Sequence, residues 1–593
     1  MLIPIVTLVF YSSSLARPTL PHENDLPLCY SLPGSPAYPT TQQWAALNSS
    51  VEGNLVSTTP LASPCHNTTA GTYNATTCTA LRQEWPLTQT HYTDSASIMA
   101  NFFTNNSCNP FSPPGGKCDS SGFVAYSTRV RGVQDIQETI AFARTHNVRL
   151  AIRNTGHDYL GKSNAPGGLA IWTHFMKGIE VIHDYRSRNP NSQSDAPGYT
   201  GPAMKLGAGV QGFEARKAAS AAGYILATGN CDTIGIAGGY VQGGGHGQLT
   251  SRFGLAADQV LAWEVVLASG EVVNATPDDP EYGDLYWALS GGGGGVFGVV
   301  VTVTVAVYRE VATVAGALSF SVSHGDDEEV FRRAVNTFIA QLGPLLDARG
   351  VGAWSVTRDS FGLSPVSILG GNSQDLRSVL DSVVDVLDAG NLSYLYQIEE
   401  FSTYYDSYEA MTPEYNVTDL HGGNTLIPRS VLDTNMGGLT SRIWEILDSG
   451  NDTAISGISV NASLHEPNKR PENSVNPAWR DAAISAVVAL PFSYTDWPLN
   501  LERQSLITQT LLPKLEQLTP AGEGGAYLNE ADPNQPNWQH AFYGDNYDQL
   551  LGIKRKYDPD GVFYALNGIG SEDWVNEDNG SLCRSDSYHS RGN

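Results

Sequence analysis

Apolar residues fall into regular patterns along this chain only after about residue 120. From Val133 to Asn147 they recur at the spacing of one helix face. Short apolar runs flank this segment at Phe123–Tyr126 and at Val148–Arg153, where apolar and polar residues alternate as in a strand. The pattern predicts a strand, a helix and a second strand, which leads into the turn Gly156-His157.

The next segments continue this alternation of helices and strands. An alanine-rich stretch predicts a helix at residues 211–222, and apolar runs predict strands at residues 169–172, 260–267 and 299–307. Glycine clusters flanked by strands are a repeated feature of this region, at residues 156–168, 235–247 and 291–298.

From about residue 315 to residue 520 the pattern changes to that of a separate α+β unit. Helical spacing occurs at Glu328–Leu342 and Leu376–Leu387. A last helical run begins near Tyr547 and is ended by the sequence Asp558-Pro559-Asp560-Gly561. Four segments predict strands that can pair in an antiparallel sheet, at residues 318–322, 392–401, 455–462 and 484–490.

Length and charge limit the possible functions. The 593 residues exceed what one hydrophobic core organises, so two or three domains are expected. The formal net charge of −26 argues against a general nucleic-acid surface, because such a surface needs cations to neutralise phosphates.

The N-terminus has the pattern of a secretory signal peptide. Met1 to Phe10 is largely apolar and small residues follow as far as Ala16, so we expect cleavage after Ala16 and a secreted protein. A buried N-terminal strand is the alternative. No later segment has the ~18 uninterrupted apolar residues that span a bilayer, so membrane anchoring is not expected. Sequons for N-glycans agree with export, at Asn48, Asn67, Asn74, Asn105, Asn274, Asn391, Asn416, Asn451, Asn461 and Asn579.

The seven cysteines form an odd set for a secreted protein. If Cys231, which lies in a glycine-rich turn, is reserved for chemistry, six remain for three disulfides. The sequence does not fix their pairing. Short loops favour Cys65 with Cys78 and Cys108 with Cys118, which leaves Cys29 for Cys583.

Two turns carry the nucleophilic side chains of the chain's central region. His157 ends the run Arg153-Asn154-Thr155-Gly156, and Cys231 precedes Asp232-Thr233-Ile234-Gly235. Glycine turns let backbone N–H groups approach an anion, and an imidazole and a thiolate can both attack an electrophilic ring. We therefore expect a buried cofactor that is cradled and covalently anchored. The alternatives are a core histidine with satisfied hydrogen bonds and a small buried apolar cysteine.

Other kinds of site lack their signature. The chain contains no HExxH or CxxC motif and no histidine cluster with zinc spacing, so no metal site is expected. It also lacks a GxSxG nucleophile turn and the nicotinamide-type arrangement of a first strand that opens directly into a helix.

The motifs around these turns resemble those of the vanillyl-alcohol oxidase and p-cresol methylhydroxylase superfamily, specifically its berberine-bridge-enzyme-like branch and the secreted fungal type. The resemblance covers most of the chain after residue 120, including the tail Asn546-Tyr547-Asp548-Gln549-Leu550-Leu551. It implies FAD, bound covalently through its 8α-methyl carbon to His157 and through its C6 to Cys231.

The resemblance implies an α+β fold. A two-part PCMH-type FAD-binding domain is followed by an antiparallel-sheet substrate domain flanked by helices, and a C-terminal element returns to the FAD domain. The expected divisions are a signal peptide (1–16), a disulfide-stapled extension (17–120), the FAD domain (121–310), the substrate domain (311–525), the C-terminal element (526–570) and a tail (571–593).

Further cofactor contacts are expected in and around the glycine turns. Tyr240 departs from the histidine that the branch often has after Gly238-Gly239, which puts its role beside the flavin in doubt. The expected contacts, besides His157 and Cys231, are Arg153, Asn154, Thr155, Gly156, Asp158, Ser163, Gly229, Thr233, Ile234, Gly235, Gly238, Gly239, Tyr240, Gly243, Gly244, Gly245, His246, Gly247, Asp258, Gly298, Val300, Asn546 and Tyr547.

The substrate side departs from the carbohydrate-oxidising relatives. Where they have a Tyr-x-Asn-Tyr-x-Asp run, this chain has Tyr527-Leu528-Asn529-Glu530-Ala531-Asp532. We expect Glu530 to replace the second tyrosine as base, with a pKa raised by burial and with Asn529 beside it. The alternative is a solvated loop glutamate. Gln397 and Glu399 share one face of a predicted strand and are further candidates for the catalytic cavity, although surface side chains are equally ordinary there.

The expected function is that of a secreted oxidase that passes a hydride from an alcohol-type or amine-type carbon of a small molecule to FAD, with O₂ as acceptor. The resemblance places Ile234 where side-chain bulk controls oxygen access, so a dehydrogenase with another acceptor is the first alternative. A non-catalytic FAD-containing protein is the second.

Overall fold

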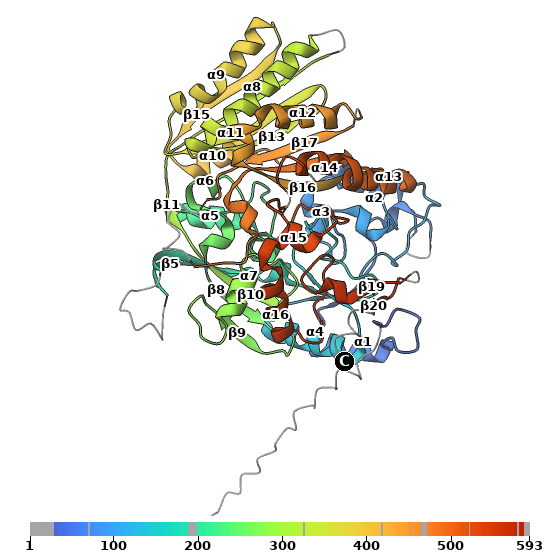
Figure 1. The fold of residues 1–593 in the computed structure, drawn as a ribbon. Coiled ribbons are helices and arrows are strands. Elements are labelled where there is room, and N and C mark those ends of the chain that lie inside the picture. Colours follow the sequence, from blue (N-terminus) through green and yellow to red (C-terminus); the bar gives the residue numbers. More distant parts are fainter. Residues whose placement is uncertain are drawn as a thin grey trace, which may run out of the picture.

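The computed structural model describes residues 29–68, 72–187, 199–323, 327–414, 416, 419–450, 452–463, 471–520, 522–577 and 580–585. The predicted signal segment, residues 1–16, lies outside these ranges. Figure 1 shows a large sheet with its helices in the upper part of the molecule and smaller sheets in the lower part, with the C-terminal helices returning to the lower part. This arrangement confirms the expected α+β fold.

The first sheet of the lower part contains the predicted strand–helix–strand unit. Its inner strands are parallel, and helix α4 (Val133–His146) packs Ile136 and Ile140 into the core beneath them. Strand β3, at one edge of this sheet, leads into the loop that carries His157. In spatial order the strands are β1 (Leu55–Ser57), β2 (Tyr126–Arg129), β4 (Leu169–Trp172) and β3 (Leu150–Arg153).

A second, antiparallel sheet completes the lower part. Its first two strands were not predicted, and the first is largely solvent-exposed, so its sequence lacks a continuous apolar face. In spatial order the strands are β5 (Ile179–Arg186), β6 (Thr200–Gly207), β10 (Val299–Ala306), β8 (Val260–Val266) and β9 (Val272–Ala275), accompanied by α5 (Gly212–Ala221), α6 (Thr250–Phe253), α7 (Gly283–Leu289) and the pair β7 (Tyr224–Ile225) and β11 (Tyr308–Arg309).

The upper part is built on a seven-stranded antiparallel sheet. The four strands predicted here are present, and three more, which we did not predict, lie between or beside them. Because β15 and β16 form opposite edges of this sheet, a site beside one of these strands is remote from the other. From edge to edge the strands are β15 (Tyr394–Phe401), β12 (Thr313–Ser321), β14 (Ser360–Leu369), β13 (Val351–Val356), β17 (Ala454–Ser459), β18 (Ala482–Pro491) and β16 (Leu420–Pro428).

Helices cover this sheet, and most of them contribute to its largest hydrophobic core. Phe331 and Phe338 of α8 pack with Phe361 of the sheet, and Leu376 of α9 joins the same cluster. The helices are α8 (Glu328–Asp347), α9 (Ser373–Ala389), α10 (Tyr404–Met411), α11 (Arg429–Thr434), α12 (Met436–Leu447), α13 (Trp497–Leu506) and α14 (Leu512–Glu516).

The C-terminal segment crosses back to the lower part. It contains α15 (Trp538–Tyr543), α16 (Tyr547–Tyr557) and the hairpin of β19 (Trp574–Asn576) and β20 (Leu582–Arg584). Tyr557 donates a hydrogen bond of 2.7 Å to Asp284 of α7, so α16 is fixed against the lower part.

The N-terminal extension is held by disulfides in the predicted pairing. The helices of the extension are α1 (Thr41–Ser50), α2 (Ala75–Glu84) and α3 (Thr88–Tyr92). Cys65–Cys78 ties a short loop to α2, Cys108–Cys118 closes a second short loop, and Cys29–Cys583 joins the extension to β20. Cys231 is the free cysteine.

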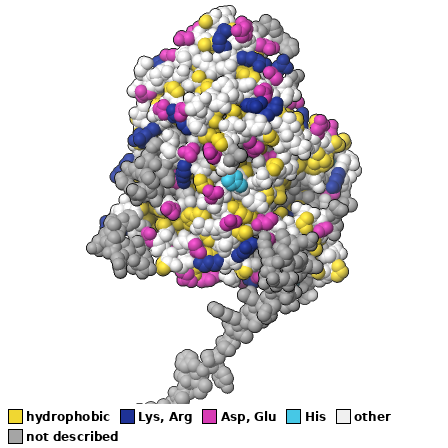
Figure 2. Space-filling model, viewed as in Figure 1, with side chains coloured by type: hydrophobic (Ala, Val, Ile, Leu, Met, Phe, Trp, Pro, Cys, Tyr) yellow, Lys and Arg dark blue, Asp and Glu magenta, His cyan; other side chains and the backbone are white. Residues whose placement is uncertain are grey.

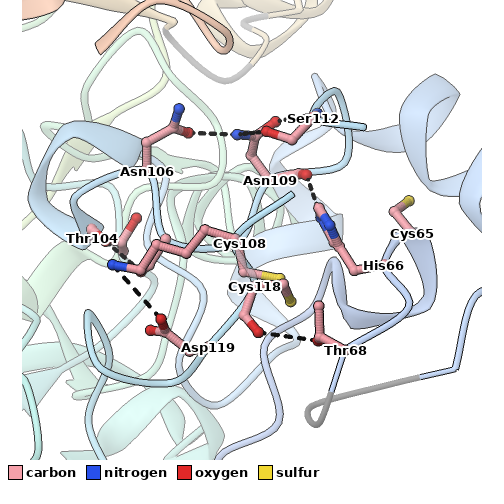
Figure 3. Close-up of a disulfide and its surroundings, with 12 residues drawn as sticks. Cys65, His66, Thr68, Thr104, Asn106, Cys108, Asn109, Ser112, Cys118 and Asp119 are labelled. Atoms are coloured by element: carbon pink, nitrogen blue, oxygen red, sulfur yellow. Dashed lines mark hydrogen bonds and ion pairs between the residues drawn. A yellow bond between two sulfur atoms is a disulfide. The ribbon is translucent and has the colours of Figure 1, made fainter. Parts of the chain in front are cut away.

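Figure 3 shows the surroundings of Cys108–Cys118. Within the described ranges, one group of side chains has the spacing of metal ligands. It consists of His66, Cys108 and Cys118, whose possible ligand atoms lie within 4.8 Å of one another. Both sulfurs are bonded to each other and His66 Nε2 lies 2.8 Å from the carbonyl of Asn109, so no thiolate is available to a metal.

The surface mixes charges of both signs. On the face in Figure 2, Lys and Arg side chains lie among Asp and Glu side chains and do not gather into one patch. Within the part of the chain that the structure describes, no helix has the length and apolar character to cross a membrane.

Candidate functional site

A cavity opens where four loops of the lower part meet. They are residues 154–163, 234–242, 294–300 and 527–530, and the space between them is about 1100 Å³ including its opening to solvent. Because His157 lies in its wall, it is named the His157 cavity. Segments far apart in the sequence thus converge on one chamber.

The two predicted nucleophiles lie side by side: His157 lines the cavity, and Cys231, which does not line it, lies next to His157. His157 Nε2 is 2.7 Å from Thr233 Oγ1, and Cys231 Sγ is 4.0 Å from His157 Nε2 and 3.7 Å from Thr233 Oγ1. Burial lowers the pKa of His157 to about 4, so its imidazole is neutral at ordinary pH. Burial likewise raises the pKa of the Cys231 thiol.

The loop that carries Cys231 is held from both halves of the molecule. Arg216 of α5 pairs with the Asp232 carboxylate, and its guanidinium lies 3.4 Å from the ring centroid of Tyr408. The Tyr408 hydroxyl donates a 2.6 Å hydrogen bond to the carbonyl of Asn230. The sulfur position is therefore fixed by α5 and by α10 of the upper part.

Glycines in the cavity wall are required by close contacts. A Cβ on Gly235 would lie 2.5 Å from Asn154 Oδ1, and Gly156 has φ +81, a conformation that side chains rarely adopt. The side chain of Asn154 also donates a 2.5 Å hydrogen bond to the carbonyl of Ala208. These contacts pack the two turns closely against each other at the His157 end.

Three polar atoms in the cavity wall have no partner among the described residues. They are Asn154 Oδ1, Gln242 Oε1 and Lys162 Nζ, all buried. Among the residues that the structure describes, Lys162 is the one lysine or arginine that lines this cavity, and burial lowers its pKa to about 8. A buried cation without a partner is unfavourable, so the cavity is suited to an anionic ligand.

A second cavity adjoins the first. It lies between β16, β17 and β18 of the upper sheet and residues 100–103 of the extension. Glu530 and Tyr159 line both cavities, so Glu530 stands at their junction. We name the second chamber the Glu530 cavity.

The Glu530 carboxylate has a buried histidine as neighbour. His246 Nε2 lies 3.4 Å from Glu530 Oε1, at ion-pair distance and without hydrogen-bond geometry. The His246 ring packs against Tyr527 and Trp479. The Glu530 side chain keeps 28% of its surface exposed, so it is less buried than the sequence led us to expect.

Most of the Glu530 cavity wall is apolar, and its ionisable groups are acidic apart from one histidine. Asp419 accepts a hydrogen bond from Tyr494, and His421 contacts Asn500 Oδ1 and Gln504 Oε1, both at 3.1 Å. No lysine or arginine lines it in the described ranges. Its apolar wall includes Phe102, Phe103, Leu420, Ile458, Val487 and Phe492.

Comparison with known proteins supports one assignment. The family model described as "FAD binding domain" matches residues 125–276, and the model "Berberine and berberine like" matches residues 526–570. FAD-linked oxidoreductase sor8 of Hypocrea jecorina is 40% identical over 98% of this chain and 97% of its own length. The chain belongs to the family of fungal VAO-type FAD-linked oxidoreductases.

Further members of this VAO-type family agree in sequence and structure. The VAO-type flavoprotein oxidase VAO615 of Thermothelomyces thermophilus is 38% identical over 95% of this chain and 96% of its own length. The crystal structure of the VAO-type flavoprotein MtVAO615 from Myceliophthora thermophila C1 matches with a TM-score of 0.85 at 37% identity, covering 94% of this chain and all of that one. The protein is therefore an FAD-dependent oxidoreductase that acts on a small molecule.

The residues of the His157 cavity fit FAD. The unpartnered ammonium of Lys162 suits an anion such as a pyrophosphate. Unpartnered amide oxygens on Asn154 and Gln242 suit the hydrogen-bond donors of a flavin or an adenine ring. The wall of this cavity therefore suits the FAD that a VAO-type protein binds.

Most of the predicted contacts around the first turn lie in the cavity wall. Asp158 closes this turn, because its carboxylate accepts the backbone N–H of Lys162 at 2.6 Å and the hydroxyl of Ser163. The predicted residues that line the cavity are Asn154, Thr155, Gly156, His157, Asp158, Ser163, Ile234, Gly235, Gly238, Gly239, Tyr240, Gly298, Val300, Asn529 and Glu530.

Gln397 and Glu399 lie elsewhere. They share one face of β15, as expected, but β15 is the edge strand farthest from β16, and both side chains are exposed. Neither lines the His157 cavity or the Glu530 cavity. We therefore drop them as catalytic candidates.

Arg153, Asp258, Asn546 and Tyr547 also face away from the cavity. Arg153 donates to the carbonyls of residues 91, 94 and 97, and Asp258 pairs with Arg480 at 2.9 Å. Asn546 donates to two carbonyls of the upper part, and the Tyr547 hydroxyl donates to a glutamate of the tail. These side chains connect segments of the chain.

The second glycine run serves packing. A Cβ on Gly243 would lie 2.5 Å from the Asn529 amide, and one on Gly247 would lie 2.0 Å from a backbone carbonyl. Gly244 and Gly245 have positive φ. Three other predicted contacts, Gly229, Thr233 and Cys231, do not line the cavity. His246 contacts Glu530 rather than the cavity. Gly243–Gly247 do not line the His157 cavity, and their contact with the cofactor stays a prediction.

Sequence reasoning missed several lining residues. Tyr159 and Lys162 lie two and five residues after His157, so the motif itself contained a signal that we did not use. Gln242 is also in the wall. Asn101 and His421 of the Glu530 cavity come from segments without a motif, so only the folded chain reveals them.

Proposed function

We propose that this protein is a secreted flavoprotein oxidase. It transfers a hydride from an alcohol-type or amine-type carbon to FAD that is bound covalently to His157 and Cys231, and O₂ is reduced to H₂O₂. The observation that carries the proposal is the pairing of one neutral imidazole with one free thiol, 4.0 Å apart, at a cavity suited to FAD.

The hydrogen bond at one nitrogen of the His157 ring supports the proposed attachment. Thr233 holds His157 Nε2, which leaves Nδ1 as the nucleophile. The glucooligosaccharide oxidase of Acremonium strictum, which shares the fold at 18% identity, carries a 6-S-cysteinyl, 8α-N1-histidyl FAD. His157 and Cys231 would hold FAD by bonds that each replace a flavin C–H and a protein N–H or S–H, with the release of two protons and the transfer of two electrons to an acceptor such as O₂.

FAD and the residues of the chain have different roles in the proposed reaction. FAD, when bound, supplies a two-electron acceptor for the hydride. Glu530 at the cavity junction accepts the hydroxyl proton of the substrate, and His246 is its neighbour at 3.4 Å. Asn529 donates to the carbonyl of Gly239 at 2.9 Å and so holds the glycine turn against the base.

The lining of the Glu530 cavity favours a substrate class. Its apolar wall and its two carboxylates, Asp419 and Glu530, suit an uncharged alcohol on an apolar ring or chain. A sugar would need more polar partners than this wall offers, and an anionic substrate would meet like charges.

Anaerobic mixing with a panel of alcohols and amines tests the proposal. Bleaching of the flavin by an uncharged apolar alcohol, followed by H₂O₂ formation on admitting air, is the expected result. Bleaching without reoxidation by O₂ would favour the dehydrogenase, and a flavin that no donor reduces would favour the non-catalytic protein. Secretion and N-glycans are tested separately by the N-terminal sequence and the mass of protein from culture medium before and after deglycosylation.

The two covalent bonds are expected to differ in their dependence on pH. With its pKa near 4, His157 stays neutral from pH 5.5 to 7.5, so bonding to it should proceed at a constant rate. Cys231 reacts as a thiolate, and its raised pKa means that the reactive fraction grows about tenfold per pH unit. Reconstitution of apoprotein with FAD in the Cys231→Ala and His157→Ala variants measures each rate. Parallel pH profiles would contradict this assignment.

Lys162 is expected to bind FAD through its charge. In the background without both covalent bonds, Lys162→Met should weaken FAD binding at least about tenfold, because an ammonium paired with an anion is lost. Titration of flavin fluorescence measures the dissociation constant. Lys162→Arg keeps the charge and should restore most of the affinity, whereas equal affinity of the Met variant would show that Lys162 has no such partner.

A further inference from the structure

One segment of the N-terminal extension forms a wall of the Glu530 cavity. Ala100, Asn101, Phe102 and Phe103 all line it, although they come from the region without any family motif. Three of these four residues belong to a short helical turn, Asn101–Thr104. The extension therefore contributes directly to the chamber next to the catalytic carboxylate.

This segment is fixed to the loop that carries His157. The N–H of Met99 donates to the carbonyl of Gly156 at 3.0 Å, and Asn164 Nδ2 donates to the carbonyl of Phe103 at 3.1 Å. Gly161 has φ +68, and a Cβ there would lie 2.6 Å from the Phe103 ring. The wall is thus positioned by the same loop as the flavin nucleophile.

The segment is also fixed to the upper part. The Phe102 ring stacks on Trp497 with centroids 5.4 Å apart and meets the edge of His421 at 5.2 Å. Asn106 Nδ2 donates to the carbonyl of Tyr494, and Trp85 Nε1 donates to its hydroxyl. With both ends held, the wall is rigid enough to select among substrates.

Within this wall Asn101 has an unused hydrogen-bond donor. Its side chain is 7% exposed, and Nδ2 has no partner in the part of the chain that the structure describes. A buried amide without a partner is unfavourable. Two other polar side chains of this cavity are engaged elsewhere: both His421 nitrogens contact amide oxygens, and Asp419 accepts from Tyr494.

We propose that Asn101 is a substrate-recognition residue, whose Nδ2 donates a hydrogen bond to an uncharged acceptor oxygen, such as a carbonyl or ether, remote from the reacting carbon. The inference rests on the proposed function, because it takes the Glu530 cavity as the substrate chamber. The extension then determines specificity, because Phe102 shapes the chamber and Asn101 donates a hydrogen bond to one oxygen of the substrate.

Matched probes test this assignment in the holoenzyme. The probes are 3- and 4-acetylbenzyl alcohol, which carry a carbonyl, and 3- and 4-isopropylbenzyl alcohol, which have nearly the same shape without it. Dissociation constants come from the change in flavin absorbance on binding. For the wild type, we expect at least one acetyl compound to bind about tenfold more tightly than its isopropyl counterpart.

The variant Asn101→Leu keeps the volume and removes the donor, so it should abolish this preference while the flavin spectrum stays unchanged. Gln89→Ala, an exposed amide of the same extension, should keep the preference. Equal affinities in the wild type, no measurable binding of either kind of probe, or a preference that persists in Asn101→Leu would overturn the inference. Lack of flavin reduction by bound alcohols would instead count against the proposed oxidase function.

Discussion

Acid-precipitated wild-type protein is expected to stay yellow, whereas the double variant His157→Ala/Cys231→Ala should give a colourless pellet and a yellow supernatant. Each single variant should keep one bond and therefore a coloured pellet. The reason is geometric, because the two nucleophiles lie 4.0 Å apart and His157 lines the cavity that suits FAD, so under the proposed attachment either bond alone holds the flavin. Intact-mass measurement should show the mass of one FAD on the wild type and on both single variants.

The loop around Cys231 offers a control for this experiment. Tyr408→Phe removes the hydrogen bond to the carbonyl of Asn230 and leaves both nucleophiles in place. It should reduce the occupancy of the cysteine bond more than that of the histidine bond, which peptide mapping resolves. A colourless wild-type pellet with no added mass would contradict covalent attachment at both residues.

Local sequence patterns predicted this site well where a motif and its turn are contiguous. The strand before His157 and the loop from Asn154 to Asp158 lie together in the cavity wall. The odd cysteine was a second, independent signal, because the other six pair as expected and leave Cys231 free.

The predictions that differ from the structure depend on the tertiary arrangement of the chain, which local sequence patterns do not contain. Period-two alternation correctly placed Gln397 and Glu399 on one face, but it carries no information about where a strand lies in its sheet. Glycine runs indicate close approach of backbones without saying to what, so Gly243 was assigned to the cofactor when it packs on Asn529. Arg153 adjoins the motif, yet its side chain organises the extension.

No sequence motif predicted the arrangement of the two cavities. Glu530 was predicted from one departure in a short run, and the structure places it where both chambers meet. The opposite wall comes from a segment more than four hundred residues earlier in the chain. Under the proposed function, substrate selection is a property of the assembled extension and the upper sheet together.

Glu530→Gln should lower kcat by about 10²- to 10³-fold with the best donor of the panel, because a positioned base contributes rate enhancement of this size. Glutamine keeps the shape and cannot accept the proton. Flavin absorbance and covalent attachment should be unchanged, since Glu530 lies at the junction and away from His157 and Cys231. Stopped-flow reduction of the flavin under anaerobic conditions measures the step directly.

Two comparisons separate a base from a merely structural carboxylate. Glu523→Gln, an exposed glutamate seven residues earlier, should reduce the flavin at the wild-type rate. The acidic limb of the wild-type pH profile of kcat/KM, where the rate rises as the base loses its proton, should be absent in Glu530→Gln. If Glu530→Gln keeps both the rate and the limb while His246→Gln loses them, the base is His246, its neighbour at 3.4 Å. The carboxylate would then serve to orient that imidazole, and the assignment of roles at the junction would be reversed.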